Sequence, residues 1–167
     1  MKRNHIFFTA VIFTLGLYLT HNSRPADHNL PGIPAIEPKD ITGVVIEKAD
    51  SSLTLKKNSG RWRIFPGGYP ADPQKVAGII DAVGNLDIVM LISESDNYVI
   101  FGLDDRNRIT VKAFNGDTPI REIEVGNTGP SRAHTFVRIG NDRRVYYANG
   151  TFRDIFEITA DGLKDTG

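Results

Sequence analysis

An apolar run close to the N-terminus separates this 167-residue chain into parts that must fold differently. Residues 1–3 are a basic start, and residues 6–19 are apolar except for two threonines and one glycine. A basic segment followed by such a run is typical of an export signal or a membrane anchor. We therefore expect the segment 1–21 to direct the chain to a membrane and the globular fold to begin after it.

The length and the flank of this segment bear on whether it is retained. As a helix, residues 6–19 span ~21 Å, which is short of a ~30 Å hydrocarbon core unless Thr20 and the flexible Arg3 extend the span. The residues after Thr20 offer signal peptidase no pair of small residues. We expect an uncleaved anchor over residues 6–20 with its N-terminus in the cytoplasm, and the alternative is a cleaved signal.

The segment 22–40 is rich in proline and has neither a helical nor an alternating period. Its prolines are Pro25, Pro31, Pro34 and Pro38. Prolines at this spacing favour extended polyproline II geometry at about 3.1 Å per residue. We predict a linker of up to ~60 Å between the anchor and the folded domain.

Charge and composition exclude several kinds of function. Lysine and arginine total 20, as do aspartate and glutamate, so no electrostatic footprint for nucleic acid is expected. Cysteine is absent, which excludes disulfides, thiolate catalysis and cysteine-based zinc sites. Phosphate-loop, dinucleotide and metalloprotease motifs are also missing from the sequence. We expect neither a metal nor a cofactor.

Residues 41–158 alternate between strand-like and helix-like patterns, which predicts a single α+β domain. Strand-like patterns predict strands near 41–48, 52–57, 61–65, 108–114, 120–125, 134–139 and 145–147, and a short apolar run predicts another near 88–92. Apolar residues at helical spacing predict a main helix from Asp72–Pro73 to about Asp87 and a short helix near Phe152. We expect a mostly antiparallel sheet, or sheets, packed by these two helices, with residues 159–167 as a tail.

The order of strands followed by a helix occurs twice, over residues 41–87 and 109–158. A duplicated unit is therefore one interpretation of the domain. Between the two stretches, Asp96 and Gly102 predict a single helical turn that ends in left-handed geometry, with Leu103 folding back.

Short motifs in a fixed order resemble the domain of unknown function 4340 family over roughly residues 44–158. They are residues 60–64 with Pro66, residues 69–72, the run Phe101-Gly102-Leu103-Asp104, and residues 125–126 ahead of 135–137. The resemblance implies a bacterial envelope protein with an N-terminal membrane segment and a periplasmic domain, here in a single copy. Some members occur with gliding-motility-type ABC transporter systems, and the family has no assigned reaction or catalytic residues.

Two regions carry residues that could contact a ligand or a partner. Trp62 lies between Arg61 and Arg63, and an aromatic ring flanked by cations can hold a sugar or an anionic group. The alternation of Trp62 with Ile64 favours a core or edge position instead. The polar loop 126–132 is the second region.

The loop 126–132 combines exposed backbone amides with Asn127 and Arg132, which could hold an anion. His134, the only histidine after residue 40, follows the loop and could act as a base with Ser131. Its position at the start of a strand favours a structural role. An ordinary connection is likewise the favoured interpretation of the loop.

These observations lead to one expectation and one alternative. We expect a non-enzymatic, membrane-anchored protein of the bacterial inner membrane whose periplasmic domain binds a protein partner, with an ABC transporter component as the class that the resemblance implies. The alternative is a module that binds or senses a small ligand or a glycan in the periplasm.

Overall fold

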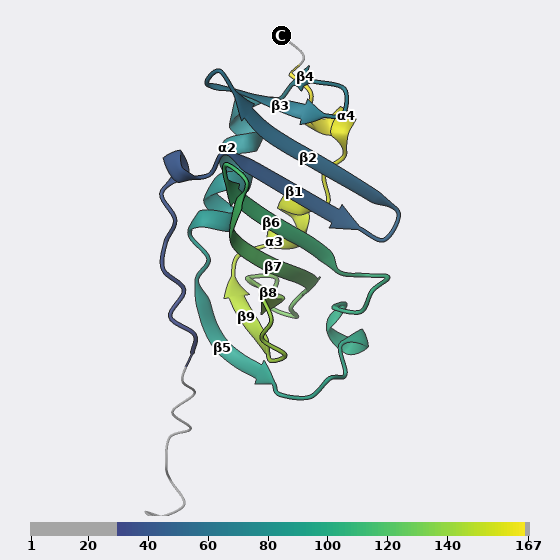
Figure 1. The fold of residues 1–167 in the computed structure, drawn as a ribbon. Helices are drawn as coiled ribbons and strands as arrows, with labels where there is room; N and C mark the ends of the chain where they lie inside the picture. Colours follow the sequence, from purple (N-terminus) through teal and green to yellow (C-terminus); the bar gives the residue numbers. More distant parts are fainter. Residues whose placement is uncertain (1–29, 166–167) are drawn as a thin grey trace, which may run out of the picture.

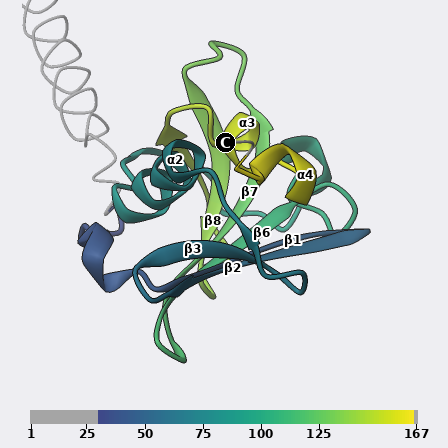
Figure 2. The same ribbon diagram turned by 90° about the horizontal axis from the view of Figure 1, so that it is seen from above.

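The computed structural model describes residues 30–165, so the predicted anchor and the first part of the linker lie outside the described residues. One antiparallel sheet of nine strands forms the centre, and helices pack against one of its faces (Figures 1 and 2). The expected mostly antiparallel sheet with few helices is confirmed. The strands are β1 Gly43–Lys48, β2 Ser51–Asn58, β3 Arg61–Phe65, β4 Tyr69–Pro70, β5 Ile88–Ser93, β6 Ile109–Asn115, β7 Thr118–Thr128, β8 His134–Ile139 and β9 Val145–Asn149.

The helical elements are short, and α2 is the longest of those described. They are η1 Pro38–Asp40, α2 Pro73–Gly84, η2 Val99–Phe101, α3 Phe152–Phe156 and α4 Ala160–Leu163. Within residues 30–165, none of these helices has the length and apolar character that a membrane span requires.

Helix α2 begins where the sequence predicts and ends slightly earlier. The Asp72 carboxylate accepts hydrogen bonds from the backbone amides of Gln74 and Lys75, and Pro73 occupies the first helical position. The helix ends at Gly84, whereas the periodicity predicts an end near Asp87. Its buried residues face the sheet and form the main core with the inward side chains of the strands.

The sheet has the order β4-β3-β2-β1-β6-β7-β8-β9-β5. Each half contains four strands that are consecutive in sequence, β1–β4 and β6–β9, and each set is followed by a helix. The halves join through the antiparallel pair of β1 and β6. In each half, the segment that follows the helix pairs with the outer end of the other half. Strand β5, which follows α2, pairs with β9, and Lys164, which follows α3 and α4, forms a bridge with Ala71 just after β4.

A second, smaller core lies on the opposite face of the sheet, which we call the outer face. Phe101 and Leu103 of the predicted turn pack there against Val145, with Phe136 beside them. Gly102 between them is left-handed, with φ of 66°, as the sequence predicts for the end of the turn. The segment between β5 and β6 is therefore anchored across β8 and β9.

The folded domain begins before residue 41, so the predicted linker 22–40 is too long. Ile33 and Ile36 pack against the main core, and the Ile36 amide donates a hydrogen bond to the Gly84 carbonyl at 3.0 Å. We call residues 33–40 the strap. Its two isoleucines carry no period that would reveal their burial from sequence.

The domain also extends beyond Ile158, so residues 159–167 are not simply a tail. Helix α4 lies in this segment, and its Leu163 is fully buried. The Asp72 amide donates a hydrogen bond to the Leu163 carbonyl at 2.9 Å. The C-terminal segment thereby closes the edge of the sheet next to β4.

Candidate functional site

The six residues that sequence reasoning proposed lie in two separate regions. Arg61, Trp62 and Arg63 are on β3, whereas Asn127, Arg132 and His134 lie at the connection between β7 and β8. Strands β2, β1, β6 and β7 separate β3 from β8 in the sheet. The structure therefore brings together residues within each group but does not unite the two groups in one site.

Trp62 is partly buried against the main core and does not form a platform with its flanking arginines. It lies on the same side of β3 as the buried Ile64 and packs against the main core. Arg63 points to the outer face, and its Nη1 donates a hydrogen bond to the Gly68 carbonyl at 2.9 Å. The alternation of residues 61–65, rather than the cation–aromatic pattern, is thus the informative signal.

His134 ends a row of aromatic rings on the outer face. Its ring centroid lies 5.4 Å from that of Tyr147, which lies 4.6 Å from Phe136, which in turn lies 5.0 Å from Phe101. Ser131 Oγ is 3.2 Å from His134 Nδ1. Among the described residues, no carboxylate joins this pair as the third group that orients a catalytic base. The arrangement suits a structural histidine.

The loop after β7 forms a small cleft with the start of α3. The cavity has a volume of about 330 Å³ and combines the Arg132 cation with the Asp154 carboxylate. Arg132 has a φ of 55°, which a non-glycine residue seldom adopts. The Asn127 side chain lies over Gly102 and not in this cleft. A Cβ atom added to Gly102 would lie only 2.4 Å from Asn127 Oδ1.

The hairpin between β8 and β9 is fixed by a charged cluster. The Asp142 carboxylate accepts hydrogen bonds from the Arg144 side chain and from Tyr146 Oη, the latter at 2.8 Å. The Arg144 hydrogen bonds hold the pKa of Asp142 well below its usual range. Burial and the bond to Asp142 raise the pKa of Tyr146 to about 12. These groups stabilise the hairpin and leave no free acid or base.

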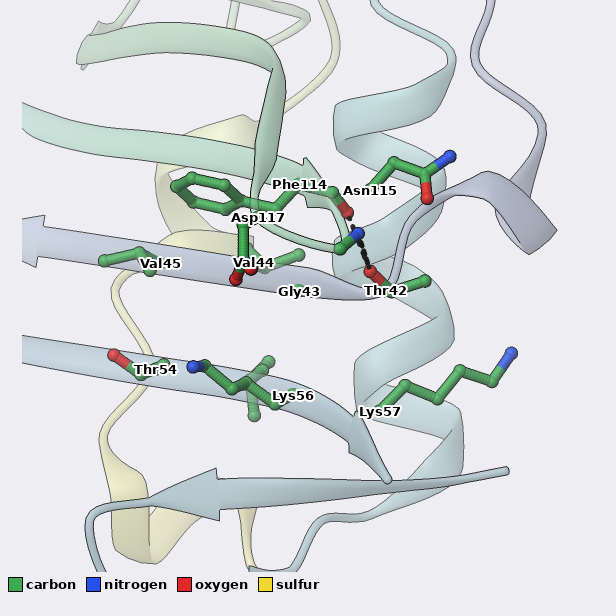
Figure 3. Close-up of a pocket in the computed structure, with 12 residues that line it drawn as sticks. Thr42, Gly43, Val44, Val45, Thr54, Lys56, Lys57, Phe114, Asn115 and Asp117 are labelled. Carbon is green, nitrogen blue, oxygen red and sulfur yellow. Dashed lines mark hydrogen bonds between the residues drawn. The ribbon is translucent and has the colours of Figure 1, made fainter. Parts of the chain in front are cut away.

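A larger groove that sequence reasoning missed lies on the outer face across β1, β2 and β6. Its volume is about 700 Å³, within the range of ligand pockets. Gly43 and Val45 of β1 line its floor, Lys56 of β2 lines one side, and Phe114 and Asp117 line the other (Figure 3).

The β6–β7 hairpin gives the groove its second wall. A bulge interrupts the register between Ala113 and Phe114 and re-aims the end of β6. Thr42 Oγ1 holds the hairpin by accepting a hydrogen bond from the Gly116 amide at 2.7 Å and donating one to the Phe114 carbonyl at 3.3 Å. The sequence Asn115-Gly116 predicts this hairpin but not the pairing that places it beside Gly43 and Lys56.

Strand β5 lies at an edge of the sheet within the described part of the chain and has exposed apolar side chains. Val89 and Met90 are 38% and 52% exposed, although the strand contains no charged residue. Val99 and Ile100 on η2 are also exposed, at 67% and 63%. Within residues 30–165, no group of three or more His, Cys, Asp or Glu residues is placed to hold a metal ion.

Comparison with known proteins gives a family but no characterised relative. Neither the curated proteins nor the solved structures contain a match. A family model described as domain of unknown function (DUF4340) matches residues 62–167, which is more than half of the chain. The match includes the turn Phe101-Gly102-Leu103-Asp104, whose Phe101 and Leu103 are anchors of the second core. The chain therefore belongs to the domain of unknown function 4340 family.

Proposed function

We propose that this chain is a non-enzymatic, single-pass protein of a bacterial inner membrane whose periplasmic domain binds a protein partner. The partner class that we propose is a component of the same envelope, such as an ABC transporter subunit. The observation that carries the proposal is the apolar, unpaired edge of β5.

The two edges of the sheet differ in how they are protected. Strand β4 has two residues, one of them Pro70, and the Asp165 amide donates a hydrogen bond to the Pro70 carbonyl. Strand β5 has six residues, no proline and no charge, and its outer side pairs with no strand of the described chain. An apolar edge of this kind is a template for a strand from another protein.

The shortened linker supports a partner that lies close to the membrane. Because the strap belongs to the domain, only residues 21–32 separate the proposed anchor from it. Twelve residues extend at most ~43 Å. A partner that contacts β5 would therefore be a membrane protein or one held at the membrane surface.

Photo-crosslinking from β5 tests the proposal in intact membranes. A photoreactive amino acid replaces Met90 in the full-length chain, and the same substitution at the exposed Lys39 of η1 serves as the control. We expect a discrete protein adduct from position 90 and none from position 39. Equal labelling at both positions, or a strictly monomeric chain without an adduct, would count against partner binding at this edge.

A charged variant of β5 provides a second test of partner binding. Met90→Lys places a cation on the exposed edge, where it opposes strand addition at little cost to the fold. We expect co-purification of the partner from gently solubilised membranes to be lost for Met90→Lys and retained for Val99→Lys, which tests whether η2 takes part. Retention in both variants would place the interface elsewhere.

The cleft beside Arg132 favours a second candidate function, a ligand-binding or sensory module. Its Arg132 and Asp154 could together hold a small polar or glycan ligand. Thermal-shift screening against envelope glycans and anionic metabolites tests this candidate, because a ligand of the native state raises the melting temperature. The Arg132→Ala variant should lose the shift.

We also propose that the two halves of the sheet descend from one duplicated unit. The support is the repeated order of four strands and a helix, together with the reciprocal covering of the outer strands. An experimental structure tests this idea: the halves should superpose about the β1–β6 pair, and different strand connections in either half would contradict it.

A further inference from the structure

The register of the sheet aligns four side-chain positions in one row beside the groove. Arg63 of β3 pairs with Lys56 of β2, Lys56 pairs with Gly43 of β1, and Gly43 pairs with Phe114 of β6. Paired residues share a face of the sheet, so all four positions belong to the outer face. The row thus contains two neighbouring cations, a position without a side chain, and an aromatic ring.

The two cations are placed without an anion between them. Like charges directly opposite on neighbouring strands destabilise a sheet. The Arg63 guanidinium is turned to the Gly68 carbonyl, and Lys56 is exposed without an ion-pair partner among the described residues. Lys57, which also lines the groove, likewise has no such partner there. The one carboxylate in the lining is that of Asp117, on the opposite wall.

Lys56 lies between two hollows that each contain apolar residues. On one side lie the groove floor at Gly43 and Val45 and the ring of Phe114. On the other side, a second hollow of about 430 Å³ is lined by Phe65 and Pro66 and shares Lys56 with the groove. An added Cβ at Gly43 would be in ordinary contact with Phe114 Cβ at 3.5 Å and with the Leu55 carbonyl oxygen at 3.6 Å, so Phe114 packs closely over this position.

We propose that this groove binds an anionic amphiphile, a lipid-like molecule with one phosphate or carboxylate group joined to an alkyl chain. The anionic group binds at Lys56, away from Asp117, and the chain lies over Gly43 and Val45 against Phe114. Charge complementarity argues for the anionic group, and the apolar lining at Val45 and Phe114 argues for an apolar chain. This site is separate from β5 and does not depend on partner binding there.

Native mass spectrometry of the full-length chain in an uncharged detergent tests the proposal. Phosphatidylglycerol and phosphatidylcholine with the same acyl chains are titrated separately. We expect preferential binding of phosphatidylglycerol to the wild type. The Lys56→Gln variant should weaken this binding by about fivefold, as expected for one exposed charge contact. Lys39→Gln, which removes another exposed lysine, in η1, is the matched control and should bind like the wild type.

Three further results bear on the proposal. Gly43→Val fills the groove and should weaken phosphatidylglycerol binding as Lys56→Gln does, with folding checked by circular dichroism. Equal binding of both lipids, or equal binding by Lys56→Gln and Lys39→Gln, would overturn the proposal. Full competition by inorganic phosphate, or displacement of the lipid by an acidic peptide that binds more tightly, would show a site for another anion and would overturn it too.

Discussion

Arg121 of β7 donates a hydrogen bond from Nη1 to the carbonyl oxygen of Gly84, 2.9 Å away, at the end of helix α2. The same nitrogen donates to the Val83 carbonyl at 2.5 Å, and Nη2 donates to the carbonyl of Pro34. Arg121 is 9% exposed, and burial lowers its pKa. A cation at this end of a helix is favoured by the helix dipole. One buried guanidinium therefore joins the strap, the main helix and the sheet.

Arg121→Met should lower the free energy of unfolding by about 2–4 kcal/mol. The loss follows because the variant leaves the carbonyls of Val83, Gly84 and Pro34 without their donor in a buried setting. Urea unfolding followed by circular dichroism measures it. Arg61→Met is the control, since Arg61 is exposed, and should change stability by less than about 0.5 kcal/mol. Equal stability of the two variants would show that the guanidinium does not hold the strap.

The role of Arg121 shows what sequence periodicity can and cannot reveal. Alternation around Val111 and Ile123 predicts the strands correctly, because each pattern depends on neighbours within one segment. The same alternation places Arg121 on the side of Ile123 and Val125, but a charged residue is seldom fully buried, so the sequence does not indicate its burial. Its burial depends on the strap and on the end of α2, which are 87 and 37 residues away in the chain.

Leu163→Ala should cost about 2–4 kcal/mol of stability, although Leu163 lies in a segment that the sequence suggests is a tail. Leu163 is fully buried, and truncation of a buried leucine leaves a cavity. Chemical denaturation of the full-length chain measures the loss. Val99→Ala, which shortens an aliphatic side chain that is 67% exposed, is the control and should have little effect. A small effect at both positions would mean that α4 does not belong to the core.

Tyr146 should ionise at about pH 12 in the native protein. Because its pKa is raised above the ordinary value near 10, its contribution to stability is complete below about pH 10 and is lost as the pH rises towards 12. An ultraviolet absorbance titration of tyrosinate, compared between wild type and Tyr146→Phe, isolates this residue. Ionisation of Tyr146 near pH 10 would contradict the buried hydrogen bond to Asp142.

Asp142 should stabilise the native protein at neutral pH and lose this effect at acidic pH. Its pKa is lowered mainly by the Arg144 hydrogen bonds, so its stabilising effect is present above the ordinary pKa near 4 and is lost as the pH falls below it. Asp142→Asn should therefore be less stable than the wild type at pH 7, and the difference should shrink under acid. Melting temperatures at several pH values provide the measurement. A difference that does not depend on pH would exclude the charge as its cause.

The candidate sites show the same limit of sequence reasoning as Arg121. The loop 126–132 could be chosen from sequence, because a long polar connection with an arginine is a local pattern. The groove could not, because Lys56, Gly43 and Phe114 become neighbours only through the pairing of β2, β1 and β6. Trp62 shows the opposite case: its flanking arginines suggest a binding site, whereas the strand period correctly predicts the side of β3 that packs against the core.

Gly126→Ala should destabilise the domain by about 2–3 kcal/mol, even though the sequence places Gly126 in a polar loop. An added Cβ would lie 2.3 Å from the Phe101 carbonyl oxygen, which is backbone and can move only if the anchored turn moves with it. Gly78→Ala is the matched control, because a Cβ there meets no atom within 4 Å and alanine favours helix by about 1 kcal/mol. Urea denaturation should therefore shift in opposite directions for the two variants. Similar shifts in the urea midpoint would mean that the turn at Phe101 can move away from β7. The second core would then not fix the segment that contains Val99 and Ile100.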